Sequence, residues 1–208
     1  MKGLLLKDLL GLRKYLRTLL LFIAAYALLI FLMDSPYFLG SMIVLMCAMA
    51  SITSFSFDHV AGWDIYALSL PVSRRDVVRS KYLLSLILTA GGTALSLLVS
   101  VLYILFTHSG SFSEALTVGY TLFVVGMVFV AVLLPLIFRF GVEKARLLIV
   151  AVFAIPTAVF VALSNFGNLQ APDPQLLVRL LAFSPLILTV LLALSYFLSR
   201  AIYLKKEV

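Results

Sequence analysis

The chain has 208 residues, of which 63% are hydrophobic and 12% are charged, and its mean hydropathy is +1.17. A soluble domain of this length needs far more polar surface, so the composition excludes a soluble globular protein and indicates an integral membrane protein. The net charge of +7 does not require a nucleic-acid partner, because membrane topology explains where the basic residues lie. One cysteine, Cys47, and two histidines exclude a disulfide framework and argue against a metal site with several ligands.

Residues 1–17 mix leucines with basic side chains ahead of the first long apolar run. The leucines recur at helical spacing, whereas Lys7, Gly11 and Lys14 fall on the other side. This pattern predicts a helix that lies along the cytoplasmic interface, with its basic side chains among the lipid headgroups. A disordered basic leader is the alternative. The apolar run continues past Ala27, so we expect a retained anchor and not a cleaved signal peptide.

Uncharged runs then appear six times, and a membrane-spanning helix takes about 20 largely apolar residues. We predict spans at about residues 18–33, 36–57, 82–107, 115–138, 147–164 and 180–199. With both termini in the cytoplasm, every lysine and arginine except Arg179 falls on the cytoplasmic side. This bias is expected of cytoplasmic segments. The sequence therefore predicts an all-α membrane protein with six spanning helices and an external loop at about residues 165–175.

The third run carries small residues at a regular spacing. Gly92, Ser96 and Ser100 recur every fourth residue, and such a stripe lets two helix backbones approach closely in a membrane. We expect a helix to pack there. The sequence leaves open whether that helix belongs to the same chain or to another copy.

The spans carry no group that suits catalysis or ion coupling. None has a charged residue or a histidine near its centre, whereas ion-coupled transporters usually keep such groups at mid-membrane. The chain also has no HExxH motif, no Gly-x-Ser-x-Gly elbow and no phosphate-binding loop. We therefore expect no catalytic residue, no metal site and no energy source within this chain.

Residues 58–81, which we call the docking segment, are polar and lie between the second and third runs. Trp63, Tyr66 and Leu70 are spaced as apolar anchors of a short interfacial helix, and Pro71 should end that helix. Ser73 then caps a new helix, with Asp76 at its third position. This is a variant of the capping box. The density of aromatic and charged residues favours contact with a cytoplasmic protein. The alternative is that the basic residues only fix topology and touch lipid phosphates.

The stretch GWDIYALSLPVSRRDVVRSKYL, residues 62–83, resembles the cytoplasmic loop of small ABC-2-type transporter permeases. In that family a Trp-x-x-Tyr-x-x-Ser-Leu-Pro-Val-Ser-Arg-like pattern follows the second span, and it corresponds here to residues 63–74. Lys7-Asp8-Leu9, ahead of a basic patch and the first span, matches as well. The resemblance covers the whole chain in length and topology. Within the family it is closest to permeases of phenol-soluble-modulin and lantibiotic-type peptide exporters.

The resemblance implies a membrane subunit without ATPase activity, paired with a separate cytoplasmic ABC ATPase that holds ATP and Mg. Residues 1–17 would be an elbow helix, and the docking segment would be the coupling helix that sits in a cleft of the ATPase. Two permease chains, identical or different, would dock on two ATPase copies at the plasma membrane of a bacterium. The elbow residues are Lys7, Asp8, Leu9, Arg13 and Lys14, and the coupling residues are Asp58, Trp63, Asp64, Tyr66, Leu70, Pro71, Ser73, Arg74, Arg75 and Asp76.

The resemblance implies ATP-driven export of amphipathic peptides. The lack of a charged residue along the spans agrees with this, because it favours an amphipathic or apolar cargo over a small ion. The sequence identifies no substrate-binding residue. One alternative is an exporter of drugs or lipids. Another is a non-transporting membrane scaffold or sensor that recruits a cytoplasmic partner through the same segment. A third is the substrate-binding subunit of a vitamin importer, which would bind its vitamin as a single chain and need no elbow helix.

Overall fold

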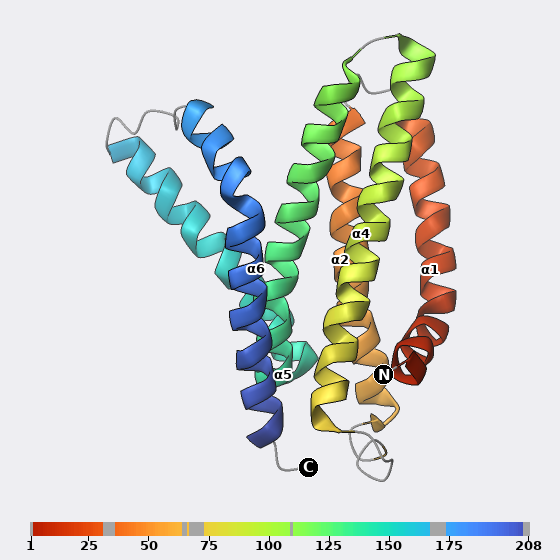
Figure 1. Ribbon diagram of the computed structural model, residues 1–208, viewed down its shortest axis with the longest axis vertical. Helices are drawn as coiled ribbons and strands as arrows, with labels where there is room; N and C mark the ends of the chain where they lie inside the picture. Colours follow the sequence, from red (N-terminus) through yellow and green to blue (C-terminus); the bar gives the residue numbers. More distant parts are fainter. Residues whose placement is uncertain are drawn as a thin grey trace.

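The computed structural model describes residues 2–30, 36–63, 66, 73–108, 110–166 and 174–205. Within these residues it holds five long helices and no strand (Figure 1). The helices are α1 (Lys2–Ile30), α2 (Pro36–Val60), α4 (Arg74–Thr107), α5 (Phe112–Phe166) and α6 (Pro174–Lys205). The prediction of an all-α protein is therefore confirmed for the described part of the chain.

Helix α5 is divided into two arms by a break at one residue. Gly141 has φ 78° and ψ 174°, a conformation that is essentially open to glycine alone. In Figure 1 the first arm, green to teal, descends to the lower end of the molecule, and the second arm, cyan, rises away from it. The two arms correspond to the fourth and fifth predicted spans.

Four helical stretches are long and apolar enough to cross a membrane. They are Tyr37–Val60, Arg74–Thr107, Phe112–Val159 and Leu181–Lys205. The third stretch contains the break at Gly141 and so covers parts of both arms of α5. The first predicted span ends at residues 31–33, outside the described residues, and its predicted boundary with the elbow helix does not interrupt α1. The count of six spans stays a prediction.

Helices α2 and α4 form the middle of the bundle. Helix α1 packs against them on one side, and α5 and α6 lie on the other side (Figure 1). The N-terminus, the end of α6, the reversal of α5 and the ends of α2 and α4 that flank the docking segment all lie at the lower end in this view. The charged ends of the helices are thus gathered at one end of the bundle.

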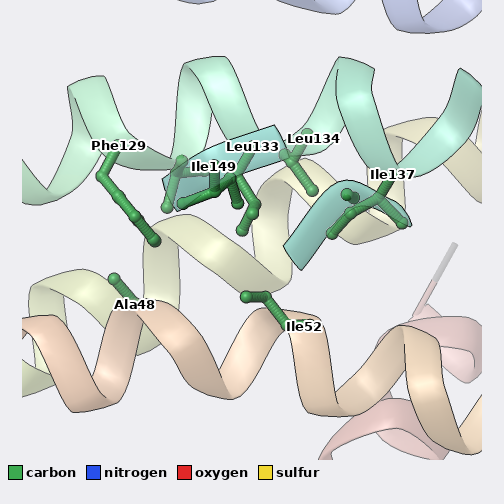
Figure 2. Close-up of a cluster of buried hydrophobic side chains, with 9 residues drawn as sticks. Ala48, Ile52, Phe129, Leu133, Leu134, Ile137 and Ile149 are labelled. Carbon is green, nitrogen blue, oxygen red and sulfur yellow. The ribbon is translucent and has the colours of Figure 1, made fainter. Parts of the chain in front are cut away.

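The largest buried apolar cluster joins α2 to both arms of α5. Figure 2 shows Ala48 and Ile52 of α2 facing Phe129 and Leu133 of the first arm, with Ile149 of the second arm beside them. All of these side chains are at most 7% exposed. The cluster fixes the lower part of the second arm to the bundle.

The small residues of α4 pack against α2 of the same chain, which answers the question that the sequence left open. A Cβ atom added at Gly92 would lie 2.6 Å from the Cβ of Cys47, and Ser96 faces Gly40 in the same way. Ser100 is buried as well. Two helices with small side chains at their contact can approach this closely. The stripe therefore serves packing within the chain.

Candidate functional site

The two ends of the docking segment meet at the lower end of the bundle. Asp58 lies near the end of α2 and Lys81 lies two turns into α4. The Nζ of Lys81 is 2.5 Å from Oδ2 of Asp58. This ion pair joins the two ends of the docking segment.

Helix α1 adds two more charged residues to this ion pair. The Nζ of Lys81 is 3.1 Å from Oδ1 of Asp8, and the Nζ of Lys7 lies 2.6 Å from Asp58 and 3.0 Å from Asp8. We call Lys7, Asp8, Asp58 and Lys81 the charged cluster. Its two positive and two negative charges cancel. Each carboxylate contacts both lysines.

The cluster has an enclosed pair and a more accessible pair. The side chains of Asp8 and Lys81 are 2% and 4% exposed, whereas those of Asp58 and Lys7 are 16% and 31% exposed. Lys81 also donates a hydrogen bond of 2.8 Å to the Oγ of Ser54. Buried ions are tolerated only when they are paired and hydrogen-bonded. Both conditions hold for Lys81.

The position of Asp8 follows from the buried face of α1. Leu4, Asp8 and Leu12 succeed one another at intervals of four residues, and all three are buried. The apolar neighbours on this face pack on α2 and α4, which carries the carboxylate into the bundle, where Lys81 meets it. Of the other residues predicted for the elbow helix, Leu9 is half-buried and Arg13 and Lys14 are exposed.

Trp63 is bound to the charged cluster through Lys7. The Nζ of Lys7 lies 3.8 Å from the centroid of the indole ring, within the range of a cation–π contact. The indole also contacts Tyr66, with ring centroids 5.5 Å apart. Val60 is 86% exposed and Tyr66 is 58% exposed. Apolar and aromatic side chains are thus presented at the charged end of the molecule.

The start of α4 is capped as the sequence predicted. The backbone N–H of Asp76 donates to the Oγ of Ser73 at 3.2 Å, and the Ser73 hydroxyl donates to Oδ2 of Asp76 at 2.8 Å. Arg75 is exposed. Arg74 instead donates to the carbonyl oxygen of Leu204 at 3.0 Å, where a cation is favourable at the C-terminal end of α6. Arg74 therefore makes a contact within the chain.

Two further side chains of α4 reach α6. The hydroxyl of Tyr82 lies 2.6 Å from that of Ser195 and 2.8 Å from that of Ser199, and Arg79 donates to the hydroxyl of Tyr196 at 3.2 Å. The first turns of α4 are thus bound to α1 and α2 on one side and to α6 on the other. Sequence reasoning missed these partners, because nothing local in the sequence indicates them.

Some predicted residues cannot be placed. Asp64, Leu70 and Pro71 lie outside the described residues, so the structure does not test their expected part in the docking segment. Among the residues that are described, no three His, Cys, Asp or Glu side chains are grouped so that they could hold a metal ion.

A family model described as "ABC-2 family transporter protein" matches residues 3–204, which is nearly the whole chain. The chain belongs to the ABC-2 transporter family. A search of curated proteins gives no match. Membership of this family, together with the apolar helices long enough to span a bilayer, makes the chain a membrane protein and a permease subunit of an ABC transporter. Such a permease associates with an ABC ATPase.

The ABC-2 permease also has a large apolar groove beside α2. Its volume is about 1350 Å³, and it is lined by α2 and by both arms of α5. None of the described side chains that line it is charged, and the polar ones among them are the hydroxyls of Ser41 and Thr157. Beyond Ile149, no described side chain of the second arm is buried. The groove is therefore an open site that suits an apolar surface.

Proposed function

We propose that this chain is the membrane subunit of an ATP-driven exporter, and that a separate ABC ATPase docks on residues 58–81. The observation that carries the proposal is the ion pair that joins the two ends of the docking segment. The ion pair between Asp58 and Lys81 fixes both of its ends, and Val60 and Tyr66 are exposed beside it. Exposed apolar and aromatic side chains on a fixed support suit a specific protein contact.

The proposed topology has six spans, with both termini and the docking segment in the cytoplasm. The six helical units, with α5 counted as two arms, supply one span each. The basic residues at the start of α4, at the reversal of α5 and at the end of α6 share the lower end of the bundle in Figure 1. Arg179 lies near the start of α6, at the opposite end. This distribution supports the orientation.

The proposed cargo is an amphipathic peptide. The apolar groove supports this choice, because about 1350 Å³ of space without a charged lining suits the apolar face of a peptide helix. Phenol-soluble-modulin and lantibiotic-type peptides belong to this class. Drugs and lipids are the competing cargoes, and transport of either without transport of peptides would contradict the proposal. In the full complex, two permease chains, identical or different, pair with two ATPase copies.

The docking role is tested with Tyr66→Ala and a matched control. Phe112→Ala removes an aromatic ring that is equally exposed, at 58%, but lies at the start of α5 at the other end of the bundle. The measurement is the affinity of each permease in nanodiscs for its partner ABC ATPase. We expect Tyr66→Ala to weaken binding by about tenfold or more, as for a central aromatic contact, and Phe112→Ala to leave binding unchanged.

Equal binding by wild type and Tyr66→Ala would contradict docking through this segment. Stimulation of ATP hydrolysis by candidate peptides then separates transport from the alternative of a non-transporting scaffold. A scaffold would bind the ATPase without any response to peptide.

A further inference from the structure

Trp63 stands where the docking segment meets α1. It is the single tryptophan of the chain. The Lys7 ammonium that lies 3.8 Å from its ring centroid also contacts Asp58 at 2.6 Å and Asp8 at 3.0 Å. One cation therefore joins the indole to the charged cluster. Helix α1 takes part in the geometry of the docking segment through this side chain.

We propose that Lys7 is a positioning residue, which holds Trp63 and the start of the docking segment in the orientation that the ABC ATPase binds. The proposal rests on the docking function stated above. In this proposal the first turns of α1 help to form the surface that the ATPase binds, in addition to lying at the membrane surface.

The division of contacts within the charged cluster points to this role. Both lysines bridge Asp8 and Asp58. The bridge made by Lys81, at 3.1 and 2.5 Å, is sufficient to join α1, α2 and α4 without Lys7. Its side chain is enclosed, whereas that of Lys7 is 31% exposed. The contact that Lys7 makes and Lys81 does not make is the one with the indole. Holding Trp63 is thus the distinct contribution of Lys7.

Packing encloses the indole only in part. Trp63 is half-buried and packs on the buried cluster that contains Phe138 of α5 and Tyr203 of α6, but it also lines a cavity of about 60 Å³ beside these residues. The packing around the ring is therefore incomplete. The cation over the ring face adds a directional attraction that favours the orientation seen here.

The first experiment uses the permease alone in nanodiscs, labelled with 5-fluorotryptophan, so that Trp63 gives a single fluorine resonance. Lys7→Gln removes the cation, Lys7→Arg keeps it, and Lys14→Gln removes an exposed lysine of α1 as the matched control. We expect Lys7→Gln to shift or broaden the resonance by more than its linewidth. Lys7→Arg and Lys14→Gln should stay close to wild type. All three variants should keep the wild-type melting temperature within a few degrees.

An unchanged resonance in Lys7→Gln would overturn the proposal, and so would equal shifts in Lys7→Gln and Lys7→Arg, since the cation would then not be what holds the ring. The second measurement is affinity for the ABC ATPase. We expect roughly three- to tenfold weaker binding by Lys7→Gln, which corresponds to the loss of one partly exposed cation–π contact, with recovery in Lys7→Arg. If the ring moves while affinity stays unchanged, the orientation of Trp63 does not matter to the ATPase and the proposal is overturned, whereas docking through the segment is still decided by Tyr66→Ala.

Discussion

Replacing Lys81 by methionine should destabilise the folded permease more than removing any exposed lysine. The substitution keeps the length of the side chain and deletes its charge. Asp8, whose side chain is 2% exposed, then keeps Lys7 at 3.0 Å as the one remaining cation of the cluster, and Lys7 must also serve Asp58. Removing one partner of a buried ion pair typically costs 3–5 kcal/mol. We therefore expect a loss of about 3–5 kcal/mol in the free energy of unfolding.

The assay is equilibrium unfolding in mixed micelles, supported by melting temperature, where each kcal/mol corresponds to roughly 2–4 °C for a chain of this size. Lys144→Met, at an exposed lysine of α5, is the matched control and should stay within about 0.5 kcal/mol of wild type. The double variant Lys81→Met with Asp8→Asn leaves Lys7 with Asp58 and no net charge, so it should recover at least half of the loss. A cost for Lys81→Met equal to that of the control would refute the reasoning that the cluster is an enclosed, balanced group of charges.

Three further substitutions test the packing. Gly92→Ala places a Cβ 2.6 Å from that of Cys47 and should lower the free energy of unfolding by about 1–3 kcal/mol. Its control, Gly91→Ala, has open space around it and should raise the free energy of unfolding by about 0.5–1 kcal/mol. Gly141→Ala forces an alanine to φ +78° and should cost about 1–3 kcal/mol. Gly11→Ala, which also meets open space, is its control. Tyr82→Phe leaves the buried Ser199 hydroxyl without its phenolic partner and should cost about 1–2 kcal/mol. Adding Ser199→Ala should recover most of that loss. All are measured by thermal unfolding. Equal stability of Gly92→Ala and Gly91→Ala would contradict the close contact with Cys47, and equal stability of Gly141→Ala and Gly11→Ala would contradict the strained backbone at Gly141. Equal stability of Tyr82→Phe and wild type would contradict the hydrogen bond to Ser199.

Local features of the sequence predicted the local features of the structure. Where the structure describes them, the uncharged runs are helical, because runs of apolar residues in a membrane must satisfy their backbone hydrogen bonds internally. Ser73 caps α4 with Asp76 at the third position, since that geometry depends on residues only three apart. The reversal of α5 was harder to locate. Residues 139–146 indicate a polar connection. Glutamate, lysine and alanine within this stretch favour a helix, so the helix is broken only at Gly141.

Contacts across the bundle could not be derived in the same way. Asp8 and Lys81 are 73 positions apart, and nothing near either residue indicates the other. A signal was present for Asp8, which falls at a helical interval between Leu4 and Leu12 and so shares their buried face. Arg74 shows the opposite case. Its place in the docking segment suggested an external partner, whereas the nearby end of α6 offers carbonyl oxygens that no helix can satisfy internally.

The contacts on the two sides of α4 differ in kind. This difference determines which helices would move together if the docking segment were displaced. Toward α1 and α2, Lys81 is held by two carboxylates and a hydroxyl in an enclosed setting. Toward α6, Tyr82 is held by neutral hydroxyls, and such bonds within membranes are individually modest. The arginines Arg74 and Arg79 also donate to α6, but these two bonds are exposed to solvent. Separating enclosed ions leaves charges unpaired, whereas hydroxyls exchange partners at lower cost. A displacement of the first turns of α4 would therefore carry α1 and α2 along and change the contact with α6 first.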